Sequence, residues 1–534
     1  MILARFWKVF CEMASTKNVL LKRESKYDVT YLKHVCDLNI NTEPQAVRLT
    51  GIVCTIGPAS RDPLVLEKMM ANGMNVARLN FSHGTHQYHK ETIKNIRIAA
   101  DNYSKKLGYF HPIAIALDTK GPEIRTGVLE GGISAEIELQ EGDTIKLTAD
   151  KNLYSKCNTK CVYVGLENLH KIVPLGVRIF IDDGQLALKC TKILADSIEC
   201  VIENGGSLGS SKGVHIPGVP IDLPSVSDKD LQDINFGIAE DVDMVFLSFT
   251  RDADTVKRIQ ELVVKSGKQT QVIAKIENAP GMKNMDEIIA NADGILIDRG
   301  DLGMAIPTQK VFLAQKMIIG KCNKAGKPII CATQMLESMT YKPRPTRAES
   351  SDVANAVLDG ADCVMLSGET AKGHYPLECV KVMSDISKEA EAAVWQKQLF
   401  EDLSNEIHTK DNTHTIAIAA VAASIKNLSS AIVVLTTTGR SAHLISKYRP
   451  HCPIIAVTRS KQVARKSVIY RGILPIVHEE QLDDWIQDVN ARVEYGINYG
   501  KKVGFIRKGD SVIVITGWRE GRGFTNSMRI MEVD

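Results

Sequence analysis

The sequence predicts an α/β protein built on a (β/α)8 barrel, the TIM-barrel fold, with an inserted small β-barrel lid domain and a C-terminal α/β regulatory domain. Three observations predict this fold. Short apolar runs alternate with helix-length segments from residue 51 to about 390, a rhythm that favours a closed parallel barrel over an open sheet. Residues 121–222 interrupt that rhythm with short β-branched segments. A second strand–helix alternation begins after about residue 393.

The barrel strands are predicted from apolar, β-branched runs of four to six residues, most of them followed by a helical pattern. In chain order the eight candidates are Ile52–Ile56, Asn75–Leu79, Ile113–Leu117, Met244–Ser248, Gln271–Ile276, Gly294–Ile297, Pro328–Ala332 and Cys363–Leu366. We therefore expect residues 48–120 and 223–392 to form the barrel. Residues 1–47 would then be an N-terminal extension with a helical segment.

The segment 121–222 is predicted to be a β domain inserted after the third barrel strand. Gly- and Asp-rich turns separate its short candidate strands, which are Glu136–Leu139, Thr144–Leu147, Arg178–Asp182 and Ser197–Ile202. An insertion at the rim of a barrel is placed to act as a lid that excludes water from the site beneath it.

The C-terminal unit, residues 393–534, is predicted to be a smaller α/β domain. Its candidate strands are Ala431–Leu435, Ile454–Val457, Gly472–Ile476 and Ser511–Thr516. A run of hydroxyl residues and a glycine joins the first of these strands to a helical pattern that reaches Tyr448.

Composition excludes several classes of function. The net charge is +3, from 66 basic and 63 acidic residues, and no block of like charge indicates nucleic-acid binding. No apolar run approaches the roughly 20 residues that span a bilayer. The 12 cysteines show no CxxC spacing, which indicates a reducing compartment, so we expect a cytoplasmic protein.

The first residues are both basic and apolar, and Arg5 and Lys8 interrupt their apolar stretch. This interruption and the lack of a clear cleavage site argue against a secretory signal. We expect an alternative N-terminal extension, with Met13 as a second start, and mitochondrial targeting stays open as the less favoured alternative.

Charged residues close two consecutive predicted barrel strands. Lys275 and Glu277 end one strand, and Gly300 and Asp301 follow the next. Because the carboxyl ends of the strands form the active-site rim of such a barrel, these side chains should meet. Two carboxylates can hold Mg²⁺ or Mn²⁺ against a phosphate, and a lysine supplies positive charge beside a transferring group. The alternative for any one of them is a surface salt bridge.

Two further rim residues have two interpretations each. Arg78, at the end of the second strand, could grip a phosphate through two parallel hydrogen bonds, or it could pair with a rim carboxylate. Thr333, after the seventh strand, could contribute a hydroxyl to catalysis or simply cap the next helix.

Long motifs carry a family resemblance. Lys275-Ile-Glu-Asn278, Arg299-Gly-Asp-Leu-Gly303, Cys331–Met339, Thr346-Arg-Ala-Glu349 and Met365–Ala371 resemble pyruvate kinase. The similarity runs from about Thr30 to the C-terminus. It implies phosphoryl transfer from phosphoenolpyruvate to ADP, giving pyruvate and ATP in the last step of glycolysis, and it suggests a homotetramer.

Two other functions are weighed against this one. The first is a divergent paralogue of low activity that acts mainly as a ligand-binding or regulatory subunit. The second is a barrel enzyme that uses phosphoenolpyruvate in aldol or carboxyl chemistry. It is disfavoured by the predicted lid and by the presence of all four residues that would bind K⁺ in the pyruvate kinase family, which are Asn80, Ser82, Asp118 and Thr119.

The resemblance assigns roles to individual residues. The catalytic residues would be Lys275, Arg78 and Thr333, with Ser367 close to the same proton relay, and the phosphoenolpyruvate site would add Gly300 and Asp301. Glu277 and Asp301 would hold the Mg²⁺. The K⁺ ligands would be Asn80, Ser82, Asp118 and Thr119. The nucleotide (ADP or ATP) would lie against Asn80, Phe81, Ser82, His83, Arg125 and Lys212.

The chain departs from the family's pattern in a few places. Asp298 stands where a small apolar residue is common, Ala305 where an acidic residue is usual, and Ser350 and Ser351 alter another motif. A third carboxylate next to the metal pair would alter metal affinity or choice. Glu123, in contrast, matches the K⁺-dependent type of the family, in which independent members carry a lysine.

The resemblance also implies an effector site for fructose-1,6-bisphosphate in the C-terminal unit. The residues concerned are Thr436, Thr437, Thr438, Gly439, Arg440, Ser441, Trp485, Arg492, Arg519, Gly521 and Gly523. A loop that leads into a helix offers hydroxyls and backbone N–H groups to a phosphate. An ordinary capped turn is the alternative. Thr437 is neutral and so permits an anionic ligand, and Arg522 would either strengthen phosphate capture or imitate the effector.

Overall fold

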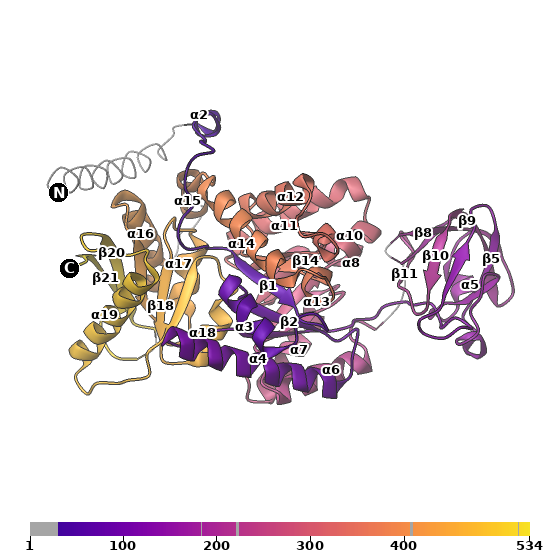
Figure 1. The fold of residues 1–534 in the computed structure, drawn as a ribbon, viewed down its shortest axis with the longest axis horizontal. Helices are drawn as coiled ribbons and strands as arrows, with labels where there is room; N and C mark the ends of the chain where they lie inside the picture. The colour runs from indigo at the N-terminus through magenta and orange to yellow at the C-terminus, as the bar shows by residue number, and fades with distance from the viewer. Residues whose placement is uncertain (1–29, 183, 220–223, 406–409, 522) are drawn as a thin grey trace, which may run out of the picture.

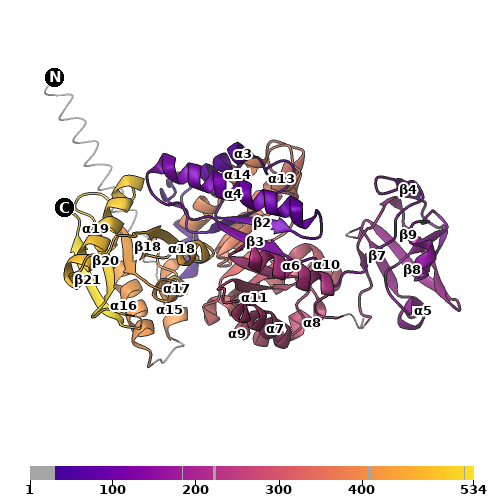
Figure 2. The ribbon, with the colours of Figure 1, turned by 90° about the horizontal axis from the view of Figure 1, so that it is seen from below.

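A computed structural model describes residues 30–182, 184–219, 224–405, 410–521 and 523–534, so the predictions for residues 1–29 and for Arg522 lie outside the described residues. Three parts follow one another along the long axis (Figures 1 and 2): the C-terminal α/β unit, the barrel, and the inserted β domain. No described helix has the length and apolar character needed to cross a membrane.

The barrel is closed and parallel, in the strand order β1-β16-β15-β14-β13-β12-β3-β2. Its strands are β1 (Gly51–Thr55), β2 (Val76–Asn80), β3 (Ala114–Asp118), β12 (Met244–Leu247), β13 (Gln271–Ile276), β14 (Gly294–Asp298), β15 (Ile329–Ala332) and β16 (Cys363–Leu366). The predicted barrel is thus confirmed, and each strand end lies within one residue of its predicted place. The strands are easy to recognise because both faces are buried, one inside the barrel and one under the helices, so they are almost wholly apolar.

Helices pack around the barrel. They are α3 (Pro63–Asn72), α4 (His86–Leu107), α6 (Asp228–Ala239), α7 (Ala253–Lys265), α8 (Ala279–Lys283), α9 (Met285–Asn291), α10 (Arg299–Ala305), α11 (Val311–Ala325), α12 (Arg347–Leu358), α13 (Gly368–Ala371) and α14 (Pro376–Ala392). A further short helix, α2 (Tyr31–Cys36), precedes the barrel. Two of these helices start with a reciprocal capping box: Ser227 and Asp230 form the one at α6, and Thr346 and Glu349 form the one at α12.

The inserted domain lies beyond the end of the barrel near α8 and α10 (Figure 1). It contains a six-stranded sheet in the order β11-β7-β8-β9-β5-β6 and the two-stranded sheet β10-β4. The strands are β4 (Glu136–Leu139), β5 (Thr144–Thr148), β6 (Cys161–Tyr163), β7 (Arg178–Ile181), β8 (Leu186–Ile193), β9 (Ser197–Asn204), β10 (Gly206–Gly209) and β11 (Val214–His215), with the helix α5 (Leu169–Ile172). The four predicted strands are present. The predicted set lacks β8, whose polar residues alternate with buried ones, and the short β6, β10 and β11.

The C-terminal unit has a five-stranded sheet in the order β19-β18-β17-β20-β21. Its strands are β17 (Ala431–Leu435), β18 (Ile454–Thr458), β19 (Ile473–Val477), β20 (Ser511–Gly517) and β21 (Thr525–Glu532). Its helices are α15 (Gln396–Asn405), α16 (Asn412–Lys426), α17 (Arg440–Lys447), α18 (Lys461–Ser467) and α19 (Trp485–Val503). The four predicted strands are present, and the fifth, β21, pairs antiparallel with β20 at the edge of the sheet.

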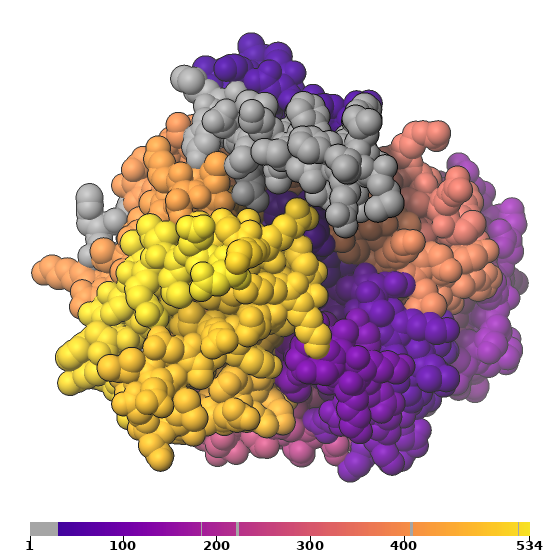
Figure 3. Space-filling view, turned by 60° about the vertical axis from the view of Figure 1, so that its left-hand side comes forward, coloured from indigo at the N-terminus to yellow at the C-terminus, as the bar shows by residue number. Residues whose placement is uncertain are grey.

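Two ion pairs, one of them fully buried, attach the C-terminal unit to the barrel. Arg449 donates to both carboxylate oxygens of Asp362, each at 2.8 Å, and Arg465 donates to Asp243 at 2.8 Å. Both aspartates directly precede barrel strands, β16 and β12, so they lie at the amino ends of the strands. In Figure 3 the C-terminal unit (yellow) also lies beside the end of α4, where Lys502 donates to the carbonyl of Leu107 at 2.6 Å. The C-terminal unit therefore binds the end of the barrel opposite the rim formed by the carboxyl ends of the strands.

Candidate functional site

Lys275 lies at the centre of a charged cluster on the carboxyl-end rim of the barrel. Its Nζ atom is 3.0 Å from Glu277 Oε2, 3.5 Å from Asp118 Oδ1 and 3.7 Å from Asp298 Oδ2. It also donates a hydrogen bond to Ser248 Oγ at 3.1 Å. Burial opposes the charge of Lys275, but the three carboxylates outweigh burial and raise its pKa above the ordinary value. The lysine is therefore a fixed positive charge in a buried place.

Arg78 supplies a second positive charge to the same rim. Its Nε donates to Asp118 Oδ2 at 2.6 Å, and one terminal nitrogen donates to Thr55 Oγ1 at 2.8 Å. Burial alone would raise the pKa of Asp118, but Arg78 and Lys275 overcome it and hold that pKa below its usual value. The pairing of Arg78 with a rim carboxylate, one of its two interpretations, is present, and it fixes the guanidinium beside Lys275 and Asp118.

Three carboxylates crowd together next to Lys275. Glu277, Asp298 and Asp301 each offer one oxygen, and these oxygens all lie within 4.8 Å of one another. Burial raises the pKa of Glu277 to about 7, with Lys275 opposing the shift and Asp298 adding to it. Burial, Asp298 and Glu277 likewise raise the pKa of Asp301. Hard oxygen donors whose charges repel one another are suited to a divalent cation such as Mg²⁺.

Thr333 has a strained backbone and does not cap a helix. Its φ is +74°, in the left-handed region that a β-branched residue rarely adopts. The expectation that it could cap the next helix is wrong, because α12 begins at Arg347 and Thr346 is its N-cap. The Thr333 hydroxyl donates instead to Asp298 Oδ1 at 2.6 Å. A Cβ atom at Gly300 would lie 2.9 Å from Thr333 Cγ2, so a glycine is needed where these two segments meet.

Arg299 holds the strained turn in place, a role that the sequence did not reveal. It donates to the carbonyl oxygens of Thr333 at 2.7 Å and Ala332 at 3.2 Å, and to Asp352 Oδ1 at 2.7 Å. Its side chain is 10% exposed. Arg299 stands inside a quoted motif, but no sequence pattern shows that its guanidinium turns toward the backbone of the neighbouring strand end.

Replacing Arg299 with lysine is expected to destabilise this turn. An ammonium group cannot reproduce the planar fork that reaches several acceptors at once. Each buried acceptor left without a donor costs about 1–3 kcal/mol. We therefore expect Arg299→Lys to lower both the midpoint of thermal unfolding and kcat, as measured by calorimetry and steady-state kinetics. An unchanged melting temperature together with unchanged kcat would show that the turn does not need this arginine.

The predicted K⁺ ligands come from two neighbouring strand ends. Asn80 and Asp118 are directly paired in the parallel ladder of β2 and β3. Asn80 Oδ1 accepts the Ser82 N–H at 3.0 Å, and the carbonyl oxygen of Thr119 accepts the Ser248 hydroxyl at 2.7 Å. The fold thus gathers amide, carboxylate and carbonyl oxygens at one edge of the rim.

The predicted nucleotide residues lie where the barrel meets the inserted domain. Arg125 donates to Glu123 Oε2 at 2.6 Å and to the carbonyl oxygen of Ser211 at 2.8 Å. Lys212 Nζ is 2.7 Å from Asp182 Oδ2 within the inserted domain. Burial and the nearby Arg125 lower the pKa of His83. His83 is therefore neutral at pH 7.

For two residues, Phe81 and His215, the structure differs from what the sequence indicated at this part of the rim. The Phe81 ring is 2% exposed and stacks on His89 at 3.9 Å between ring centroids, so its side chain belongs to the core. His215 of the inserted domain places Nε2 3.8 Å from Asp301 Oδ1. His215 was not among the predicted residues, because nothing in its local sequence pattern indicates a contact with the barrel rim.

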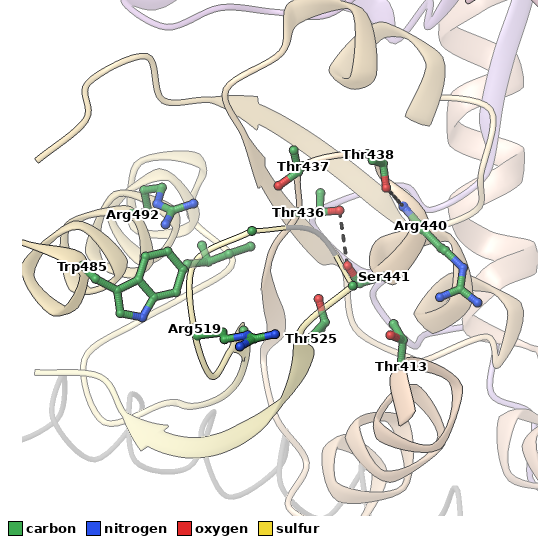
Figure 4. A pocket seen from close by; sticks show the side chains of 14 residues that line it. Thr413, Thr436, Thr437, Thr438, Arg440, Ser441, Trp485, Arg492, Arg519 and Thr525 are labelled. Carbon is green, nitrogen blue, oxygen red and sulfur yellow. Dashed lines mark hydrogen bonds between the residues drawn. The ribbon is translucent and has the colours of Figure 1, made fainter. Parts of the chain in front are cut away.

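A pocket in the C-terminal unit lies where the effector site was expected (Figure 4). The lining residues are Thr413, Leu435, Thr436, Thr437, Thr438, Arg440, Ser441, Trp485, Arg492, Gly517, Arg519, Gly521, Gly523 and Thr525. All predicted effector residues except Gly439 are among them. Gly439 has a φ of +87°, and a Cβ there would lie 2.8 Å from His443, so this glycine shapes the turn beneath the pocket.

Positive charge and hydroxyl groups dominate this pocket. Arg440 is bound to Asp411 at 2.5 Å, and Arg492 to Asp488 at 2.6 Å. Arg519 stacks on the Phe524 ring at 3.8 Å and extends toward the middle of the pocket in Figure 4. Among the lining residues there are three arginines and no carboxylate, a composition that suits an anionic ligand.

Comparison with known proteins gives consistent matches. A family model described as "Pyruvate kinase, barrel domain" matches residues 47–380, and one described as "Pyruvate kinase, alpha/beta domain" matches residues 414–531. The human protein named Pyruvate kinase PKLR is 52% identical over 506 residues, which cover 94% of this chain and 88% of that protein. Pyruvate kinase of Schizosaccharomyces pombe is 46% identical over 501 residues, covering 93% and 97% of the two chains. Pyruvate kinase 1 of Saccharomyces cerevisiae is 44% identical over 505 residues, covering 94% and 99%.

Proposed function

The chain belongs to the pyruvate kinase family, and we propose that the residues gathered around Lys275 carry out its reaction. The protein is a phosphotransferase that converts phosphoenolpyruvate and ADP to pyruvate and ATP. The observation that carries the proposal is the position of Lys275, held at the barrel rim between Asp118, Glu277 and Asp298. No observation favours the alternative of a regulatory subunit.

Phosphoryl transfer depends mainly on alignment and charge neutralisation. The P–O bond to the enolate oxygen breaks, and a bond forms between the phosphorus and a terminal oxygen of ADP. Lys275 and Arg78 stabilise the charge on the transferring group. Glu277 and Asp301 would hold Mg²⁺, which when bound neutralises charge on the phosphate and carboxylate oxygens of the substrate. Asn80, Ser82, Asp118 and Thr119 would hold K⁺ as a further positive charge.

The enolate that remains takes a proton on its terminal carbon to become pyruvate. We assign this delivery to the hydroxyl of Thr333, acting through water. Gly300 gives Thr333 room, and Arg299 holds the carbonyl of Thr333. The strain at Thr333 supports a functional role, because such a conformation persists only where its surroundings impose it.

A coupled assay tests the proposal. Pyruvate formed from phosphoenolpyruvate is followed with lactate dehydrogenase and NADH, and each component is omitted in turn. We expect activity that requires ADP, a divalent cation and K⁺, and that EDTA abolishes. Activity that survives EDTA would contradict the proposed role of Glu277 and Asp301.

The pocket of the C-terminal unit is proposed to bind fructose-1,6-bisphosphate and to activate the enzyme. An activator works only through a higher affinity for the active state. With a coupling free energy at the lower end of the usual range, it should lower the apparent KM for phosphoenolpyruvate about fivefold. Titration at subsaturating phosphoenolpyruvate measures this effect.

Thr437 provides a matched pair of variants for that titration. Thr437→Glu places a carboxylate among the three arginines and should repel the sugar phosphate, so the activation is lost. Thr437→Gln has nearly the same size without the charge, and it should retain the activation. Binding of fructose-1,6-bisphosphate to the wild-type protein in calorimetry without any change in rate would mean that the pocket is not coupled to the barrel.

Assembly and location are also proposals. We propose a homotetramer, since Phe312, Leu313 and Met317 on α11 and Tyr341 are large, exposed and apolar. Light scattering after size-exclusion chromatography measures the assembly. The cysteines in the described part of the chain form no disulfide, which supports a reducing and cytoplasmic location. The boundaries 1–47, 48–120 with 223–392, 121–222 and 393–534 remain our proposed division into domains.

A further inference from the structure

Asp298, the last residue of β14, links two groups at the barrel rim. Its Oδ1 accepts the Thr333 hydroxyl at 2.6 Å, and its Oδ2 lies 3.7 Å from Lys275 Nζ. The second distance is an ion-pair contact but is too long for a hydrogen bond. Asp298 is 8% exposed, so its carboxylate lies in a largely buried place beside Lys275.

The spacing of the neighbouring carboxylates fits a single cation. Oxygens of Glu277, Asp298 and Asp301 lie within 4.8 Å of one another. Two ligands on opposite sides of a Mg²⁺ ion are about 4.2 Å apart, because each Mg–O bond is about 2.1 Å long. Ligands at right angles around the ion are about 3.0 Å apart, and at least two of the three pairs must be of this kind, so the side chains would move inward to share one ion.

A second observation concerns Glu277, a neighbouring carboxylate of the same cluster. Glu277 is 1% exposed, and its Oε2 accepts no hydrogen bond among the described residues, although Lys275 Nζ lies 3.0 Å away. A buried carboxylate oxygen without a hydrogen bond is costly and calls for another partner.

The balance of charge at the rim favours a cationic partner. The cluster holds four carboxylates and two cationic side chains, which are Asp118, Glu277, Asp298, Asp301, Arg78 and Lys275. With every group charged, two negative charges remain. The K⁺ proposed beside Asp118 would balance one of them, so a further cation near Glu277, Asp298 and Asp301 is still favoured.

We propose that Asp298 is a third carboxylate ligand of the divalent cation that Glu277 and Asp301 hold, an inference that rests on the proposed function. One oxygen of Asp298 keeps the Thr333 hydroxyl in place, and the other binds the ion. Mg²⁺ usually takes one or two protein carboxylates and fills its other positions with water and substrate oxygens. A third carboxylate replaces one of those waters, so the free enzyme holds the ion before phosphoenolpyruvate arrives.

The test is Mn²⁺ binding to the full-length protein in the absence of phosphoenolpyruvate and nucleotide. Free Mn²⁺ is measured by electron paramagnetic resonance on the wild type and on Asp298→Ala and Asp298→Asn. We expect Asp298→Ala to raise the Kd for Mn²⁺ at least tenfold. Asp298→Asn, which keeps an oxygen for Thr333 but loses the charge, should fall between it and the wild type. Mg²⁺ should displace the Mn²⁺ in competition.

Two controls separate the possible outcomes. Glu337→Gln removes an exposed carboxylate of the same rim outside the cluster, and it should leave the Kd within twofold of the wild type. Asp301→Asn should weaken binding strongly; if it does not, the proposed metal site itself is wrong. If Asp301→Asn weakens binding but both Asp298 variants keep the wild-type Kd, only the role of Asp298 is overturned. Asp298 would then be a positioning residue for Thr333, and a lower kcat at unchanged Mn²⁺ affinity would show it. Should Asp298→Ala fail to fold, Asp298→Asn alone decides, because it preserves the hydrogen bond from Thr333.

Discussion

Lys275→Met is expected to lower kcat by a factor on the order of 10²–10³, with a smaller change in the KM for phosphoenolpyruvate. The lysine is buried, and three carboxylates keep it charged, so its charge is in place before the reaction begins. Such a preorganised charge stabilises the transition state more than the bound substrate. Methionine has a similar length without the charge, so the packing at the strand end is largely kept. Steady-state kinetics over a range of phosphoenolpyruvate concentrations measures both constants.

The surface residue Lys268 is the matched control. Its Nζ pairs with Asp241 at 2.9 Å, away from the rim cluster, and exposed pairs of this kind contribute little. Lys268→Met should therefore leave kcat and KM near the wild-type values. If Lys275→Met has a near-normal kcat and only a raised KM, then Lys275 binds substrate and does not act in the transition state.

In buffers without K⁺ the wild-type rate is expected to be lower by a factor on the order of 10², because one positive charge is then missing beside the transferring group. Glu123→Lys should relieve much of this dependence. In the structure Glu123 pairs with Arg125, and the substitution replaces a negative charge by a positive one at that position. The rates are compared in potassium and tetramethylammonium salts at equal ionic strength, since ionic strength itself weakens such interactions.

Glu123→Gln separates two explanations of a Glu123→Lys result. Glutamine removes the negative charge but adds no positive one, so this variant should still need K⁺. If glutamine abolishes the dependence as well as lysine does, the release of Arg125 is responsible and not the added charge. Equal wild-type rates in the two salts would rule out a K⁺ site in this chain.

The positions of the barrel strands along the chain could be predicted, because strands that are buried on both faces consist almost wholly of apolar residues. The β1 segment is buried at all five positions, and its neighbours in the barrel are similar. Where a strand is only half buried or lies at an edge, fewer of its residues are apolar and it is harder to recognise in the sequence. The β21 segment is mostly exposed, and β8 carries polar side chains on one face, so neither was predicted.

The types of residue at the site could be predicted, but their partners could not. Lys275 and Glu277 stand at a strand end, and a barrel brings strand ends together. The sequence does not show that Arg299 turns back to the carbonyls of a neighbouring strand or that Thr333 takes a left-handed backbone. Such contacts depend on the stagger of the strands in the closed barrel. They join residues that are far apart in the chain, and the contact between His215 and Asp301 is another of this kind.

The most direct test of the proposed chemistry is to follow the phosphorus atoms by ³¹P nuclear magnetic resonance in a mixture of the protein, phosphoenolpyruvate, ADP, Mg²⁺ and K⁺. We expect the phosphoenolpyruvate signal to fall as the γ-phosphate signal of ATP rises by the same amount, with little inorganic phosphate. Lys275→Met should slow both changes together. Loss of phosphoenolpyruvate to inorganic phosphate without ATP, or no change with the wild-type protein, would contradict phosphoryl transfer to ADP at this rim.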